Sequence, residues 1–174
     1  MADQGKGMSD LWRRLRFVFV AILVYRVGTH IPIPGIDPDR LSSLFEQNQG
    51  TILDMFNLFS GGALERMSIF ALNVVPYISS AIIMQLFSNS IPYLQELKKD
   101  GQAGRNQITQ YTRYGTVVLA FIQASALAVT LSGSGLAYTP GAAFFASAVF
   151  SVVAGTVFLM WLGEQISERG IGNG

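Results

Sequence analysis

Long apolar runs alternate with short polar or glycine- and proline-rich stretches along this chain. Four of the runs come close to the roughly 20 residues needed to cross a hydrocarbon core of about 30 Å. They cover residues 15–33, 69–87, 114–131 and 142–162. From Tyr114 to Gly163 there is no Asp, Glu, Lys, Arg or His, and only the turn-forming residues 132–141 interrupt the apolar character. The pattern predicts an all-α integral membrane protein, folded as a multi-span helical bundle.

The composition supports this class and narrows the chemistry. Of the 174 residues, 50% are hydrophobic and 13% are charged, whereas soluble domains carry about 25% charged residues. The net charge of +1 gives no basic face for nucleic acid. The chain has no cysteine and a single histidine, His30. We therefore expect no metal site and no cofactor, and we predict that the protein is not an enzyme.

The lysines and arginines predict the orientation of the helices. Nine of them fall on one side of the four runs and only Arg40 and Arg66 on the other. Short basic loops stay in the cytoplasm. The cytoplasmic segments are then residues 1–14, 88–113 and 163–174, and the external ones are residues 34–54 and 132–141.

Small residues at every fourth position indicate close helix packing. Ala120, Ala124 and Ala128 form such a stripe in the third run. In the fourth run the stripe is Ser147, Ser151 and Gly155. Small side chains at this spacing let helices approach closely in lipid, so we interpret both stripes as packing faces.

The stretch before the second run does not fit an ordinary membrane helix. Residues 55–66 are largely apolar, but Gly61 and Gly62 interrupt them and a charged pair follows. Irregular backbone at membrane depth persists only where protein covers it or where it lines a watery cavity. The residues alone leave two interpretations open. One is a re-entrant half-helix over a cavity, and the other is an interfacial segment leading into a helix kinked at Pro76.

Two other functional classes fit the residues less well. A secondary transporter would place ion or substrate ligands at the broken helix, and the second run offers few: Asn73, Tyr77, Ser79, Ser80 and Gln85. An intramembrane protease would need a Ser/His or paired-Asp arrangement. The lone His30 and the absence of Asp from all four runs argue against it.

Several long strings of the sequence resemble one family. "IPIPGI", "FNLFSGGAL", "SIFALNVVPYISSAIIMQL", "QYTRYGT" and "FLMWLGEQISERGIGNG" are similar, in this order, to the SecY family of channel subunits of the bacterial Sec protein translocase. The resemblance implies the first four spanning helices of a ten-helix channel, so the chain would be an incomplete N-terminal part. It implies a protein-conducting channel in the bacterial plasma membrane.

The resemblance also implies the roles of particular residues. Residues 55–66 would be the plug, a short half-helix that closes the channel from outside. Its residues are Phe56, Asn57, Leu58, Phe59, Ser60, Gly61, Gly62, Ala63, Leu64, Glu65 and Arg66. Val74 and Ile78 would belong to a hydrophobic ring at the waist of the pore. The sequence departs from the common family pattern here, with valine at 74 instead of isoleucine and Asn73 instead of glycine.

A third implied site is the lateral gate, through which membrane segments leave the channel sideways. Its candidates are Ser79, Ile82, Ile83, Gln85 and Gln123. For Gln123 a permanent bond between helices is an equally good interpretation. The implied partners are the SecE and SecG subunits, the SecA motor or a translating ribosome, signal sequences and nascent chains, the lipid bilayer and the C-terminal remainder of the channel subunit.

Overall fold

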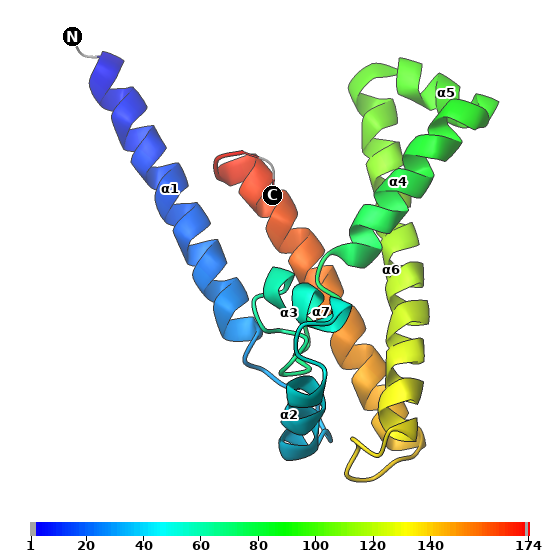
Figure 1. Ribbon diagram of the computed structural model, residues 1–174. Coiled ribbons are helices and arrows are strands. Elements are labelled where there is room, and N and C mark those ends of the chain that lie inside the picture. Colours follow the sequence, from blue (N-terminus) through cyan, green and yellow to red (C-terminus); the bar gives the residue numbers. More distant parts are fainter. Residues whose placement is uncertain (1–2, 173) are drawn as a thin grey trace.

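The computed structural model describes residues 3–172 and 174, and helices dominate this part of the chain (Figure 1). In order they are α1 (Asp3–Gly28), α2 (Pro38–Gln47), α3 (Ile52–Phe59), α4 (Val75–Ser90), α5 (Pro92–Lys99), α6 (Gly101–Gly133) and α7 (Ala142–Arg169). Among the described residues the only β-type pairings are two isolated bridges, Pro32 with Ser68 and Ile36 with Ala137. The predicted all-α class is confirmed.

The helices α6 and α7 form the central pair of the bundle. Within the described part of the chain, they are the two helices long and apolar enough to cross a membrane by length and composition. Ala120, Ala124 and Ala128 are buried on α6, and Ala124 and Ala128 share a core with residues of α7, as the stripe predicts. On α7 the residues that fill this core are Phe144, Ala148, Val149 and Val152. Of the second predicted stripe, Gly155 is buried and lies against the carbonyl of Ile69, whereas Ser147 and Ser151 are half-buried.

The first predicted span differs from helix α1 at both ends. The helix begins at Asp3, well before residue 15, and ends at Gly28, five residues before the predicted end at Ile33. Pro32 and Pro34 lack backbone amides and fix φ, so the chain continues in an extended form. Helix α1 also carries Arg13, Arg14, Arg16 and Arg26. Because of these charges it is not apolar enough to count, like α6 and α7, as a helix that could cross a membrane.

The second predicted span, 69–87, begins six residues too early. Residues 69–74 form turns, and α4 begins only at Val75 and extends to Ser90. Pro76 lies in the first turn of α4, where its missing amide would have no helical partner in any case. Asn73 has a φ of 52°, a left-handed conformation that asparagine tolerates better than most residues. Pro76 therefore starts a helix, and the kinked-helix interpretation is wrong.

The predicted external loop 34–54 contains a helix that the apolar pattern did not indicate. The side chain of Asp37 accepts hydrogen bonds from the amides of Asp39 and Arg40, and Pro38 occupies the start of α2. An aspartate cap followed by proline is a strong helix start. The sequence therefore does contain a signal for the start of α2, but this signal is short and polar, so a search for apolar runs does not find it.

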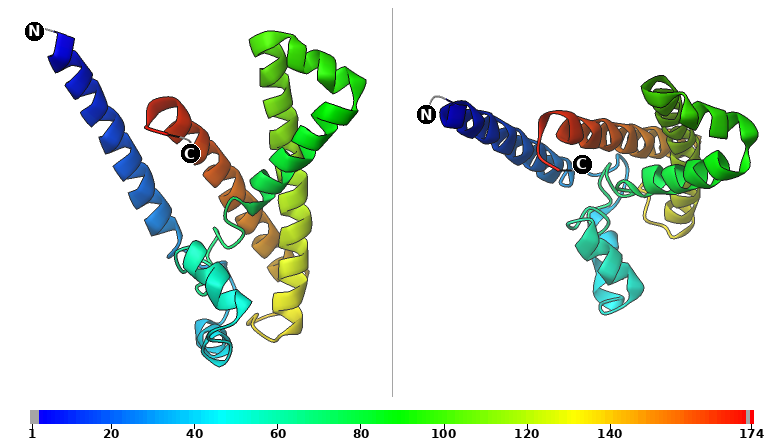
Figure 2. Two further views of the ribbon diagram at one scale, coloured as in Figure 1. Left: turned by 45° about the horizontal axis from the view of Figure 1, so that its top comes forward. Right: turned by 90° about the horizontal axis from the view of Figure 1, so that it is seen from above.

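The predicted cytoplasmic loop 88–113 is also helical. It consists of the end of α4, all of α5 and the first turns of α6, which runs without a break from Gly101 to Gly133. Figure 2 shows α4, α5 and α6 as one hairpin-like unit whose α5 end lies away from α7, while α6 packs against α7. The N-terminus of α1, α5 and the C-terminal end of α7 lie at the same end of the molecule (Figure 1). The nine basic residues on which the orientation rests therefore gather at one end.

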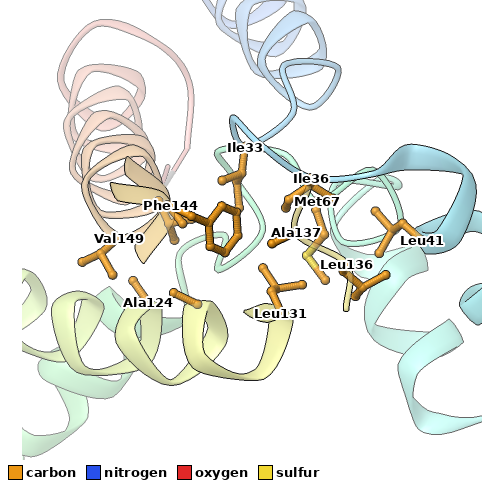
Figure 3. Close-up of a cluster of buried hydrophobic side chains, with 13 residues drawn as sticks. Ile33, Ile36, Leu41, Met67, Ala124, Leu131, Leu136, Ala137, Phe144 and Val149 are labelled. Carbon is orange, nitrogen blue, oxygen red and sulfur yellow. The ribbon is translucent and has the colours of Figure 1, made fainter. Parts of the chain in front are cut away.

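A core at the opposite end holds the connecting segments together (Figure 3). The amide of Ile33 donates to the carbonyl of Met67 at 2.8 Å, and the amide of Ile69 donates to the carbonyl of Ile31 at 3.0 Å. Side chains from α6, α7 and the loops after α1, α3 and α6 fill the centre, among them Ile33, Met67, Leu131, Leu136 and Phe144. This core fixes the middle of the segment between α3 and α4.

Candidate functional site

The segment from Ser60 to Val74 joins α3 to α4 through a series of tight turns. Gly61 and Gly62 have φ values of 65° and 82°, and Met67 has a φ of 42°. Glycine adopts this left-handed region without strain, so the glycine pair stops α3 directly after Phe59 and Ser60. The predicted half-helix over 55–66 is therefore wrong in extent: the helix covers Ile52–Phe59, and residues 60–66 are turns.

Polar side chains close these turns on themselves. The amide group of Asn57 donates to the carboxylate of Glu65 at 2.9 Å, and the backbone amide of Glu65 donates back to Asn57 Oδ1 at 3.0 Å. The Ser60 hydroxyl donates to the carbonyl of Asn57 at 2.9 Å. Asn57, Ser60 and Ala63 are buried. The segment is thus a compact unit and not an open loop.

The last turn of α1 holds this unit from the side. The Tyr25 hydroxyl donates to the carbonyl of Ser60 at 2.8 Å, and Arg26 Nη1 donates to the carbonyl of Gly61 at 2.7 Å. The ring of Tyr25 stacks on Phe70 at a centroid distance of 5.7 Å. No partner for Arg26 could be predicted from the sequence, because the bond joins residues 35 positions apart.

The apolar face of α3 is not covered by the described part of this chain. Leu58 and Phe59 are 76% and 78% exposed, and Met55 and Phe56 are also exposed. The residues that seat the segment are instead the buried Asn57, Ser60 and Ala63. In the right view of Figure 2, α2 and α3 project to one side of the row formed by α1, α7 and α6.

Val74 and Ile78 line a hollow between α4, α6 and α7. Its volume is 570 Å³. Val74 is half-buried and precedes the first turn of α4, and Ile78 is exposed one turn later on the same face. The opposite wall includes Leu159, Met160 and Gly163 of α7. The two candidate ring residues therefore line one open, partly apolar space at the start of α4.

An ion pair crosses the wall of this hollow. Arg113 Nε and Nη2 donate to the two carboxylate oxygens of Glu164 at 2.7 and 2.9 Å, so the contact is bidentate. Both side chains line the hollow. The pair joins α6 to α7, and it could not be predicted from the sequence because the two residues lie 51 positions apart. The glutamate in the quoted "WLGEQ" string was the available signal.

The five gate candidates fall on two helices, and the structure does not join them by hydrogen bonds. Ile82, Ile83 and Gln85 are exposed on α4, Ser79 is half-buried there, and Gln123 is half-buried on α6. Among the described residues no hydrogen bond of the Gln123 side chain is found. The contact between the helices lies elsewhere: the Ser80 hydroxyl donates to the carbonyl of Thr112 at 2.8 Å. A permanent interhelical bond from Gln123 is therefore absent from the described part of the chain.

Comparison with known proteins points to one family. A sequence model of the SecY family matches residues 68–174. The chain is 62% identical, over 181 aligned residues, to the protein translocase subunit SecY of Pseudomonas aeruginosa, with 100% of this chain and 41% of the relative covered. It is 57% identical over 172 residues to the same subunit of Escherichia coli, with 97% and 39% covered. The chain spans about two fifths of the length of these relatives.

Two solved structures share the fold. One is described as Sec61 in the canine ribosome-channel complex from the endoplasmic reticulum, with a TM-score of 0.63 and 16% identity over 94% of this chain and 34% of that one. The other comes from a study of the plug domain of the SecY protein, with a TM-score of 0.59 and 17% identity over 94% and 33%. At these identities the likeness concerns the fold alone.

Proposed function

Because this chain belongs to the SecY family, we propose that it forms the N-terminal part of a protein-conducting channel. The channel passes unfolded polypeptides across, and membrane segments into, the bacterial plasma membrane. The observation that carries the proposal is the hollow at the start of α4, where the apolar side chains of Val74 and Ile78 line its wall. An apolar constriction resists ions by dewetting and forms no specific bond to a passing chain. No catalytic role is proposed.

The proposed plug is the unit formed by α3 and the following turns up to Arg66. Its internal hydrogen bonds, including those of Asn57 and Ser60, keep it compact as it moves. Few bonds tie it to the helices, chiefly those from Tyr25 and Arg26. Moving segments are drawn from the least stable parts of a structure. The exposed Leu58 and Phe59 then face the remainder of the channel subunit when the pore is closed.

The proposed lateral gate uses α4 and α6. Ile82, Ile83 and Gln85 present an exposed face of α4 that suits contact with lipid, with a signal sequence or with another helix of the channel. Ser79 and Gln123 supply uncharged polar groups, and bonds of such groups in membranes are worth about 1 kcal/mol. A gate can break bonds of this strength as it opens.

The proposed setting follows from the family and from the charge distribution. The N-terminus, α5 and the C-terminal end of α7 lie on the cytoplasmic side, where the basic residues gather. There the SecA motor or a translating ribosome would deliver the polypeptide. SecE, SecG and the C-terminal remainder of the subunit would complete the wall around the hollow.

Deletion of Asn57–Glu65 in the full-length channel tests the proposed function. The closed state loses contacts that the open state does not use, so the equilibrium moves toward the open state. We expect normal export, a larger ion leak and better export of a substrate with a defective signal sequence. The measurements are a secretion assay and ion flux into vesicles. If the folded variant no longer exports normal substrates, the segment is part of the conduit wall and the plug proposal fails.

A further inference from the structure

Helices α6 and α7 pack tightly at one end and separate at the other. At the end where residues 132–141 join them, Ala124 and Ala128 of α6 share a core with Ala148 and Val149 of α7. Toward the opposite end the hollow of 570 Å³ has residues of α6 and of α7 in its wall, and Figure 1 shows the two helices diverging in this direction. A packed core resists deformation, so the distance between the helices can change at the end with the hollow and not at the other.

The ion pair of Arg113 and Glu164 bridges this open end. Both side chains line the hollow, and water reaches them, because Arg113 is 39% and Glu164 22% exposed. The other ion pairs in the part of the chain that the structure describes lie within one helix or its cap. A solvated ion pair contributes little to stability, while a bidentate contact has a defined geometry. The bridge can therefore open at low cost and close again in the same arrangement.

Polar groups surround both charges when they separate. Arg113 Nη1 also donates to Gln110 Oε1 at 3.4 Å, on its own helix. Glu168 follows Glu164 by four residues on α7 and lines the same hollow, so it offers a second carboxylate one turn away. Separation of a buried ion pair leaves charges without partners, which makes such a pair permanent. That penalty does not apply here.

The helices α4, α5 and α6 are joined more closely to one another than α6 is to α7 at this end. The Ser80 hydroxyl of α4 donates to the carbonyl of Thr112 at 2.8 Å, and this contact is buried. A Cβ at Gly115 would collide with the Ser80 hydroxyl, and one at Gly104 would collide with the carbonyl of Leu97. Such close contacts make the hairpin one unit. A widening of the hollow therefore moves the whole unit away from α7.

We infer that the pair of Arg113 and Glu164 is a releasable clasp. It holds the hollow narrow in the resting channel and opens when a polypeptide enters, as the unit of α4, α5 and α6 tilts away from α7 about the core at the other end. The inference rests on the proposed function and adds a regulation of the same hollow. The other interpretation of the pair is a permanent brace. The diverging helices and the solvated charges favour the clasp.

A reversible tether between α6 and α7 tests the clasp in the full-length channel with its partner subunits. Thr109→Cys with Ser167→Cys, in a channel otherwise free of cysteine, places two thiols in the hollow and leaves the ion pair intact. A bifunctional methanethiosulfonate joins the thiols, and a reductant releases them. We expect the tether to stop the export of a normal secretory protein and the reductant to restore it. A permanent brace predicts unchanged export, and that result would overturn the proposal.

Two controls separate a tether from an obstacle. A monofunctional methanethiosulfonate of the same length, on the same two cysteines, occupies the hollow without joining the helices and should leave export active. Met84→Cys with Ile108→Cys places the bifunctional tether in the pocket inside the hairpin. Export should continue there, because the hairpin moves as one unit. The proposal is overturned if either control stops export as completely as the tether between α6 and α7 does.

Exchange of the two charges gives a second readout. Glu164→Gln removes the clasp and should raise the export of a substrate with a defective signal sequence by about fivefold at most. Arg113→Glu with Glu164→Arg restores an ion pair and should return that export to the wild-type level. Wild-type export by Glu164→Gln, or no rescue by the exchanged pair, would overturn the clasp. If the wild-type channel itself exports no secretory protein, the proposed function fails and the clasp with it.

Discussion

At the scale of single residues, the contacts of Arg26 explain how a charged side chain is accommodated near the apolar part of α1. Its guanidinium donates to the carbonyl of Gly61, an acceptor that lacks an amide partner because the chain turns there. Intramembrane charges usually pair within the protein and mark function. Here the charged side chain stabilises a turn in which Gly61 has a positive φ. The conformation of Gly61 is thus coupled to a side chain on α1.

Replacing Arg26 with glutamine should loosen the proposed plug without unfolding the channel. The hydrogen bond is partly solvated, so we expect its loss to destabilise the closed state by about 1 kcal/mol relative to the open state. The population of the open state should then rise about fivefold. Ion flux through purified channels measures it. Arg40→Gln is the matched control, because Arg40 makes a similar bond to the carbonyl of Gly135 at 2.7 Å. Equal ion flux for the two variants would mean that Arg26 does not stabilise the closed state.

At the scale of elements, the boundaries depend on residues that a hydropathy pattern does not weigh. The apolar runs identify α6 and α7 well because both are long and uncharged from Tyr114 to Gly163. They misplace α4, because residues 69–74 are apolar yet form turns that end in Asn73 at positive φ. They miss α2, whose start depends on Asp37 and Pro38.

The contacts of the candidate site were harder to predict from the sequence than the fold. The apolar character of residues 55–66 and the glycine pair predicted an irregular segment, but its contacts are set by distant residues such as Tyr25 and Arg26. The pair of Arg113 and Glu164 likewise depends on how α6 and α7 align. Roles for Val74 and Ile78 came from the family resemblance and stay predictions.

Gly155 tests the packing of α7 against the turns before α4. A Cβ at this position would collide with the carbonyl oxygen of Ile69. We expect Gly155→Ala to destabilise the channel by about 1–3 kcal/mol, as overpacking does, and to lower its midpoint of thermal unfolding. Gly133→Ala is the control, because nothing lies within 4 Å of a Cβ there. Equal midpoints for the two variants would mean that the turns do not lie against α7.

At the scale of the whole molecule, the charges and the fold together predict an orientation. Arg105 on α6 lies near the end that carries α5, and Asp37 lies before α2 near the opposite end (Figure 1). Basic ends stay in the cytoplasm. A cysteine replacing Asp37 should therefore react with an impermeant maleimide added to intact cells, and one replacing Arg105 should react only after lysis. Labelling of the Arg105 site from outside would reverse the orientation.

The proposed function requires that a polypeptide passes through the hollow beside α4. A cysteine at Ile78 in the full-length channel, tested against a stalled secretory chain carrying one cysteine, measures this directly. Ile78 is 50% exposed and lines the hollow, whereas Ile122 of α6 is 58% exposed and does not. We predict a disulfide cross-link from position 78 and none from position 122. No cross-link at 78, or equal cross-linking at both positions, would contradict the account.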